Sequence, residues 1–167
     1  MKRKNNLKSK LKKIKMILLD VDGVLTDGKI ILSSDGVEYK NFHAHDGYGI
    51  LKAKRAGIIV GLVSGRTSEV VSKRADRLGL DLVYQGNEDK LSVFQEIKKK
   101  YNISEEETAF VGDDEFDIPL LKSVGFSAAP ANAINTVKKV VDYVTKVEGG
   151  NGAAREVIDL ILKAKKN

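Results

Sequence analysis

The chain has 167 residues, enough for one domain with a continuous core, and its 42% hydrophobic and 31% charged residues exclude wholesale disorder and a fibrous architecture. It contains no cysteine, which excludes a disulfide framework, a thiolate zinc site and a cysteine nucleophile. The formal net charge of +6 comes from residues 1–15, which hold eight of the 29 Lys and Arg residues; the other 21 face 23 Asp and Glu, so we expect no nucleic-acid groove.

The basic N-terminal segment, residues 1–15, carries apolar residues at helical spacing. Leu7, Leu11 and Ile14 recur at i, i+4 and i+7, which predicts a short amphipathic helix lying on the domain with its cations solvated. Aromatic residues are not interleaved with the cations, so we expect neither a nucleic-acid arm nor a membrane anchor. The apolar run that follows is too short for a signal peptide or a membrane span, and we expect a cytoplasmic protein. Residues 16–167 are predicted to form a single domain.

A repeating order of strand, loop and helix occupies most of residues 16–167. Apolar runs rich in β-branched residues predict strands at 16–21, 58–63, 82–84 and 109–111. Helices are expected at about 68–78, 91–101 and 152–163, the first of them ended by Gly79. This alternation predicts an α/β fold of three layers, with a parallel central sheet between two layers of helices.

One segment departs from this alternation. Residues 29–32 and 37–41 flank Ser33-Ser34-Asp35-Gly36, and an Asp-Gly pair between two short apolar runs is a strong signal for a hairpin. We therefore expect a β-hairpin that projects from the domain.

Polar residues gather directly after the predicted strands. Asp20 and Asp22 follow the first strand, Ser64-Gly65-Arg66 the second and Gly112-Asp113-Asp114 the fourth, while Lys90 opens a helix. Ligands of parallel sheets bind beyond the carboxyl ends of the strands, so these residues are expected to converge at one edge of the sheet.

Two carboxylates separated by one residue can divide the work of phosphate-ester hydrolysis. Asp20 is expected to attack phosphorus and form an aspartyl-phosphate, and Asp22 to serve as general acid to the leaving oxygen and then as general base to water. An anionic nucleophile and an anionic ester repel each other, which calls for a hard cation. The carboxylates of Asp20 and Asp113 and the backbone carbonyl of Asp22 offer the oxygen ligands that Mg²⁺ prefers.

The remaining polar residues suit the phosphoryl group. The Ser64 hydroxyl and the Gly65 N–H are predicted to bind its oxygens, and Lys90 to offset negative charge on Asp20 and on the ester. For Asp114 and Asp117 two roles stay open: one of them orders water molecules around the metal, or they cap a helix N-terminus.

These motifs resemble the haloacid dehalogenase superfamily of phosphatases: Asp20-Val-Asp-Gly as first motif, Ser64 as second, Lys90 as third and Gly112-Asp-Asp-Glu-Phe-Asp117 as fourth. Further segments, Asp-Gly-Val-Leu-Thr-Asp-Gly from Asp22, His-Asp-Gly-Tyr-Gly-Ile from His45, Ser-Gly-Arg from Ser64 and Gly-Gly-Asn-Gly-Ala-Ala-Arg-Glu from Gly149, resemble the 3-deoxy-D-manno-octulosonate 8-phosphate phosphatase family. That resemblance implies a Rossmann-like fold without a cap domain, Mg²⁺, a homotetramer built through the hairpin, and hydrolysis of a sugar phosphate of lipopolysaccharide precursor (KDO) biosynthesis.

Spacing supports the missing cap independently, because 43 residues separate Asp20 from Ser64 and 25 separate Ser64 from Lys90. The resemblance implies that Arg66 and Arg74 bind substrate, where a guanidinium matches a carboxylate bidentately. Related phosphatases of a nine-carbon ulosonate 9-phosphate carry glutamate at the position of Arg66, which favours the octulosonate ester here. Arg155 is expected either to reach substrate across a subunit boundary or to pair with Asp159. The short C-terminal tail argues against control of product release.

Two functions of other classes compete with the phosphatase. A phosphorylation-sensing receiver module also combines acidic residues, a hydroxyl and a lysine around Mg²⁺, but its lysine comes last, whereas Lys90 here precedes Asp113. A non-catalytic subunit that keeps the scaffold is disfavoured because every expected catalytic residue is present.

Overall fold

A six-stranded parallel sheet forms the centre of the protein. The computed structural model describes residues 2–166, with side chains from residue 7 onward. The strand order is β5-β4-β1-β6-β7-β8, and every neighbouring pair is parallel. The strands are β1 (Met16–Leu19), β4 (Ile59–Ser64), β5 (Leu82–Gln85), β6 (Thr108–Val111), β7 (Phe126–Ala129) and β8 (Tyr143–Val144). The sheet therefore places β1, β4 and β6 side by side at its centre.

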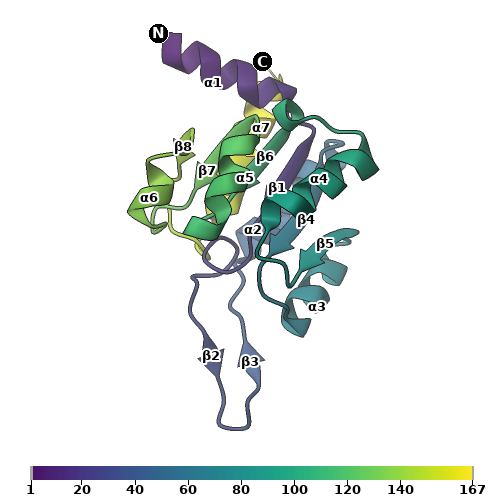
Figure 1. The fold of residues 1–167 in the computed structure, drawn as a ribbon, viewed down its shortest axis with the longest axis vertical. Helices are drawn as coiled ribbons and strands as arrows, with labels where there is room; N and C mark the ends of the chain where they lie inside the picture. Colours follow the sequence, from purple (N-terminus) through teal and green to yellow (C-terminus); the bar gives the residue numbers. More distant parts are fainter. Residues whose placement is uncertain (1, 167) are drawn as a thin grey trace.

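Helices cover both faces of the sheet (Figure 1). They are α1 (Lys2–Lys13), α2 (Ala44–Arg55), α3 (Glu69–Arg77), α4 (Lys90–Tyr101), α5 (Ile118–Ser123), α6 (Asn135–Lys138) and α7 (Ala153–Lys166), with 3₁₀ turns η1 (Glu105–Glu107) and η2 (Glu115–Asp117). Side chains alternate along β1: Ile17 and Leu19 join a core with α2, α3 and α7, and Met16 and Leu18 join a second core with α4. The predicted α/β fold of three layers is confirmed.

The four predicted strands and three predicted helices are all present, each within a few residues of its expected bounds. Gly79 ends α3 as expected, with φ at +60° and its N–H donating to the Asp76 carbonyl, while Leu80 N–H donates to the Ala75 carbonyl. The strands β7 and β8 and the helices α2, α5 and α6 were not predicted.

The predicted hairpin consists of β2 (Ile31–Leu32) and β3 (Glu38–Tyr39), which pair antiparallel. It extends away from the sheet at the opposite end from α1 (Figure 1). Gly36 has φ at +83° and closes the turn by donating to the Ser33 carbonyl. The hairpin exposes apolar side chains, including Ile30 at 63% and Leu32 at 62% of their full area.

The amphipathic helix α1 lies on the domain, as its spacing predicts. Leu11 and Ile14 are buried in the core beneath α7, and Leu7 packs against the same core. Its cations are not simply solvated: Lys10 Nζ lies 2.6 Å from Asp142, and Lys13 Nζ lies 2.6 Å from Glu106. Among residues 2–166, none of the helices combines the length and apolar character that crossing a membrane requires.

Candidate active site

The predicted polar residues converge in a pocket of about 330 Å³ beyond the carboxyl ends of β1, β4 and β6. It is lined by seven residues expected at the site: Asp20, Asp22, Ser64, Gly65, Arg66, Lys90 and Asp113. Between Asp20 and Ser64 the chain forms the hairpin and α2, and between Ser64 and Lys90 it forms α3 and β5. Neither interval contains a separate cap domain.

The loop after β1 has a conformation that requires glycine. Gly23 has φ at +84°, and a Cβ atom there would lie 2.0 Å from Asp113 Oδ2. The loop is tightened by the N–H groups of Val24, Leu25 and Thr26, which all donate to the Val21 carbonyl. Glycine therefore lets the side chain of Asp113 lie directly over the catalytic loop.

A glycine-rich loop at Gly149 and Gly150 packs against the loop after β1. A Cβ atom at Gly149 would lie 1.7 Å from the carbonyl oxygen of Gly23, and Gly150 N–H donates to the Val24 carbonyl at 3.1 Å. Asn132 holds this support in place by accepting a hydrogen bond from Gly149 N–H at 2.9 Å. The segment from Gly149, one of those that resemble the phosphatase family, therefore supports the loop after β1.

Three carboxylates and one ammonium form the charged centre of the pocket. Oxygen atoms of Asp20, Asp113 and Asp117 lie within 4.8 Å of one another. Lys90 Nζ lies 2.8 Å from Asp20 Oδ2 and 2.6 Å from Asp117 Oδ1. The site thus holds more negative than positive charge.

Burial and this excess of negative charge shift the pKa values of the site residues. Burial, reinforced by the nearby Asp117 carboxylate, raises the pKa of Asp20 to about 7. Burial together with Asp20 and Asp117 raises the pKa of Asp113 to about 8. Burial alone would lower the pKa of Lys90, but its attraction to Asp20 and Asp117 outweighs that effect and raises it. Lys90 is therefore charged, and the carboxylates need a further cation to be ionised together.

The donor set fits a hard divalent cation, which takes oxygen ligands. Asp117 is committed to other partners: Oδ1 accepts from Lys90, and Oδ2 accepts from the N–H groups of Asp113 at 2.8 Å and Asp114 at 3.2 Å. Asp20 and Asp113 line the pocket, whereas Asp117 is fully buried and does not, so Asp20 and Asp113 are the carboxylates placed to bind a metal. Asp117 therefore positions Lys90 and the loop after β6.

Asp114 is exposed and caps the 3₁₀ turn η2, where its Oδ1 accepts from Glu115 N–H at 2.7 Å. The capping role that the sequence left open is thus present for Asp114. The ordering of water around a metal stays a prediction.

Other residues of the pocket are suited to a phosphoryl group. Ser64, at the end of β4, is 3% exposed, and its Oγ accepts from Arg66 N–H at 3.3 Å, which leaves the hydroxyl hydrogen available as a donor. Gly65 and Lys90 line the same pocket. A hydroxyl, a backbone amide and an ammonium are donors of the kind that phosphate oxygens accept from.

Two residues at the base of the hairpin, Glu38 and Lys40, were not predicted but contact the site. Lys40 Nζ lies 2.5 Å from Asp22 Oδ1 and 3.5 Å from Glu38 Oε1. Glu38 in turn accepts hydrogen bonds from Arg66 Nη2 at 2.9 Å and from Ser68 Oγ at 2.8 Å. Their alternate positions on a strand were the available signal, since such residues share one face.

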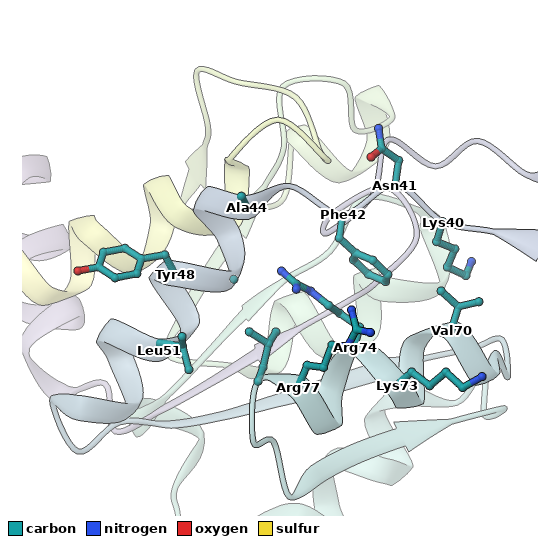
Figure 2. A pocket seen from close by; sticks show the side chains of 12 residues that line it. Lys40, Asn41, Phe42, Ala44, Tyr48, Leu51, Val70, Lys73, Arg74 and Arg77 are labelled. Carbon is teal, nitrogen blue, oxygen red and sulfur yellow. The ribbon is translucent and has the colours of Figure 1, made fainter.

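The two predicted substrate-binding arginines lie in different places. Arg66 lines the catalytic pocket, with Nη1 3.7 Å from Asp22 Oδ2. Arg74 instead lines a separate, larger cavity of about 810 Å³, next to Lys73 and Arg77 of α3 (Figure 2). Its guanidinium carbon lies 5.7 Å from the centre of the Phe42 ring. The structure therefore does not bring Arg74 to the catalytic pocket of its own chain, and its contact with substrate stays a prediction.

Arg155 adopts the simpler of its two expected arrangements. Its Nε donates to Asp159 Oδ2 at 2.6 Å along α7, and its guanidinium carbon lies 5.4 Å from the centre of the Tyr48 ring. Asp46 of α2 caps the first turn of the same helix, accepting from Arg155 N–H at 2.7 Å.

Comparison with known proteins agrees with this geometry. Residues 80–157 match the family model of haloacid dehalogenase-like hydrolases. The 3-deoxy-D-manno-octulosonate 8-phosphate phosphatase KdsC of Escherichia coli K12 is 43% identical over 156 residues, which cover 93% of this chain and 83% of that protein.

Solved structures give the same result. The corresponding phosphatase of Moraxella catarrhalis, in complex with magnesium ion, phosphate ion and a KDO molecule, has a TM-score of 0.95 and 42% identity, covering 98% of this chain and 94% of that one. A putative hydrolase of the same superfamily from Legionella pneumophila has a TM-score of 0.97 and 41% identity, covering 98% and 90%. The chain therefore belongs to the 3-deoxy-D-manno-octulosonate 8-phosphate phosphatase family of the haloacid dehalogenase-like hydrolases.

Proposed function

We propose that this protein is a Mg²⁺-dependent phosphomonoester hydrolase that acts through an aspartyl-phosphate on Asp20, with 3-deoxy-D-manno-octulosonate 8-phosphate as its substrate. The observation that carries the proposal is the convergence of Asp20, Asp22, Ser64, Lys90 and Asp113 in one pocket. Each supplies a different part of phosphoryl transfer: Asp20 is the nucleophile and Asp22 the acid, Ser64 donates a hydrogen bond to the phosphoryl group, Lys90 offsets negative charge, and Asp113 is a metal ligand.

In the first half of the reaction, Asp20 attacks phosphorus. Its Oδ1 accepts from Val21 N–H at 2.7 Å and its Oδ2 from Lys90 at 2.8 Å, so the carboxylate is fixed in place. As the new bond forms, the bond from phosphorus to the sugar oxygen breaks and Asp22 gives that oxygen a proton. The products are the free sugar and an aspartyl-phosphate.

In the second half, a water molecule attacks the phosphorus of the aspartyl-phosphate. Asp22, now ionised, takes a proton from that water, and the bond between phosphorus and Asp20 breaks. Inorganic phosphate leaves, Asp20 is a carboxylate again and Asp22 is protonated. Ser64 and Gly65 hold the phosphoryl oxygens during both steps.

Asp20, Asp113 and the backbone carbonyl of Asp22 would hold Mg²⁺, which supplies positive charge to the transferring phosphoryl group and lets the crowded carboxylates ionise together. The bound magnesium and phosphate ions of the Moraxella catarrhalis relative support this assignment. So do the pKa values of Asp20 and Asp113, which burial and neighbouring carboxylates raise, because a cation between the two groups would offset both effects.

The choice of substrate rests on the relatives and on Arg66. The KDO molecule in the Moraxella catarrhalis complex supports an eight-carbon ulosonate, and Arg66 lies in the catalytic pocket, where a guanidinium can bind its carboxylate. Arg66 now pairs with Glu38, so binding a substrate carboxylate would require that contact to open or to be shared. We place the reaction in the cytoplasm, on precursors of lipopolysaccharide.

The test is a substrate panel with and without Mg²⁺. We expect phosphate release from octulosonate 8-phosphate, weaker release from a nine-carbon ulosonate 9-phosphate, and loss of both in EDTA. Asp20→Asn removes the nucleophile while keeping the shape of the side chain, and kcat is expected to fall by about 10⁴-fold or more. Wild-type protein inert toward the whole panel, or Asp20→Asn retaining activity, would contradict the proposal.

A further inference from the structure

The lysine at the base of the hairpin, Lys40, contacts the proposed acid Asp22. The Lys40 side chain is only 2% exposed, and its Nζ lies 2.5 Å from Asp22 Oδ1 and 3.5 Å from Glu38 Oε1. A buried ammonium is stable only when it is paired, and these two carboxylates provide the pairing. Lys40 lines the larger cavity (Figure 2) and is absent from the lining of the catalytic pocket, although it contacts Asp22, which lines that pocket.

Glu38 fixes the position of this lysine. Its Oε1 accepts from Arg66 Nη2 at 2.9 Å, and its Oε2 accepts from Ser68 Oγ at 2.8 Å. Ser68 is buried and occupies the N-cap position of α3. The hairpin base is thereby tied to the start of α3, and Lys40 is held between Glu38 and Asp22.

This contact gives the two oxygens of Asp22 different roles. A lysine ammonium has hydrogens to donate and no lone pair to accept with, so the oxygen that faces Lys40 must accept. When Asp22 is protonated, its proton therefore lies on the other oxygen, Oδ2. The Arg66 guanidinium also approaches Oδ2, but its Nη1 lies 3.7 Å away, too far for a hydrogen bond.

We propose that Lys40 is a positioning residue that holds Asp22 Oδ1 and so leaves Oδ2 as the oxygen that carries the catalytic proton; this rests on the proposed function. The Oδ2 proton passes to the ester oxygen as the bond of that oxygen to phosphorus breaks and Asp20 takes its place. Oδ2 then removes a proton from water as the water oxygen bonds to phosphorus and Asp20 is released. Without Lys40 the Asp22 carboxyl group can rotate, and its proton points at the leaving oxygen in a smaller fraction of the enzyme–substrate complexes.

The experiment compares two esters that differ in their need for an acid. An alkyl phosphate such as octulosonate 8-phosphate leaves as an alkoxide and needs the proton, whereas p-nitrophenyl phosphate leaves as a stable anion without it. Because kcat/KM reports the formation of the aspartyl-phosphate, Lys40→Met should lower kcat/KM about 100-fold for the sugar phosphate and less than about threefold for the aryl ester. Lys40→Arg keeps a charged donor and should restore most of the loss.

The matched control is Lys29→Met. Lys29 lies at the other side of the hairpin base, its side chain is 77% exposed, and it pairs with Asp27, outside the catalytic pocket. Both of its kcat/KM values should equal those of the wild type. If Lys40→Met does not fold, Lys40→Gln is measured in the same way.

Unchanged kcat/KM for both esters, or an equal loss for both, would contradict the role of Lys40, since an equal loss indicates a general effect on binding or structure. Wild-type protein inactive toward both esters would contradict the proposed function itself, and with it the role of Lys40. A selective loss for the sugar phosphate that Lys40→Arg restores is the result that the proposal requires.

Discussion

At the scale of single residues, the chemistry of the site follows from crowding like charges in a buried place. Lys90 holds Asp20 near Asp117, and the Asp113 N–H donates to Asp117. Burial, reinforced by these neighbouring carboxylates, raises the pKa of Asp20 to about 7 and that of Asp113 to about 8. Asp117 adds to this crowding, and its oxygens accept hydrogen bonds from Lys90 and from the N–H groups of Asp113 and Asp114. Ionising these buried carboxylates together is unfavourable in the metal-free protein and becomes favourable when a divalent cation is bound.

A dependence of stability on pH follows for the metal-free protein. The pKa values of Asp20 and Asp113 in the folded protein lie above their ordinary value of 3.8. Between about pH 4 and 8 the folded protein therefore retains protons that the unfolded chain has already released. Stability should therefore fall as pH rises through that window. Mg²⁺ must displace these protons, so its affinity should rise with pH up to about 8.

Thermal unfolding in EDTA and in Mg²⁺, at pH 5.5 and pH 8, measures both effects. The increase in Tm caused by Mg²⁺ should be larger at pH 8, and Asp113→Asn, which removes one of the two titrating groups, should reduce the difference. An Mg²⁺-induced increase that is the same at both pH values in the wild type would contradict this account of the site.

The sequence predicted most of the site because its residues follow strands. The ends of β1, β4 and β6 must meet at one edge of a parallel sheet, so Asp20, Ser64 and Asp113 could be placed together without coordinates. Alternate spacing could place Glu38 and Lys40 on one face of the hairpin, but it could not place them against Asp22 and Arg66, because those contacts depend on how the hairpin packs on the domain. The same limit applies to Arg74: the sequence predicts that it lies on the helix α3, but not that it lines the larger cavity.

At the scale of elements, the missed helix α2 shows where local propensity fails. It contains Gly47 and Gly49, and glycine within a helix costs about 1 kcal/mol relative to alanine. Tertiary packing explains Gly49, where a Cβ atom would lie 2.9 Å from Arg155 Cδ and 3.3 Å from Arg155 Cα; at Gly47 a Cβ atom would meet only the movable end of the Arg74 side chain at short range. β8 was missed for a different reason, since two residues carry too little periodicity to read.

The catalytic loop after β1 gives a test with a matched control. Gly23→Ala should lose Mg²⁺ binding and activity, because the new Cβ atom would displace the Asp113 carboxylate. Gly36→Ala in the hairpin turn has nearly the same φ, +83° against +84°, and no atom within 4 Å of the new Cβ.

Both variants should lose about 1–2 kcal/mol of stability from the strained backbone, measured by denaturant unfolding. Activity separates them, since Gly36→Ala should keep that of the wild type. Equal activity in the two variants would show that the close approach of Gly23 and Asp113 does not matter for catalysis.

At the scale of the whole molecule, an open catalytic pocket and an apolar hairpin belong together. The pocket holds about 330 Å³ and has no cap domain over it, so a sugar phosphate would remain largely in contact with solvent on a single chain. The hairpin meanwhile exposes Ile30, Leu32, Val37 and Tyr39 far from the core. Residues from a second copy would cover both, and for this reason the homotetramer expected from the family resemblance remains our proposal.

Light scattering after size-exclusion chromatography tests this proposal. The wild type should have a mass about four times the 18.3 kDa of one chain, and Leu32→Lys, which places a charge on the exposed hairpin, should reduce it. Val147→Lys, at an exposed apolar residue outside the hairpin, serves as the comparison and should leave the mass unchanged. A wild-type monomer, or a Leu32→Lys tetramer, would contradict assembly through the hairpin.

The central claim is that Asp20 carries the phosphoryl group, and trapping that intermediate tests it most directly. Wild-type protein with Mg²⁺ and substrate labelled in its phosphate is quenched in acid during a single turnover, and the labelled peptide is identified. The account predicts label on the peptide that contains Asp20, released by hydroxylamine and missing in Asp20→Asn. Rapid phosphate release with the label on no peptide, or on a peptide without Asp20, would contradict it.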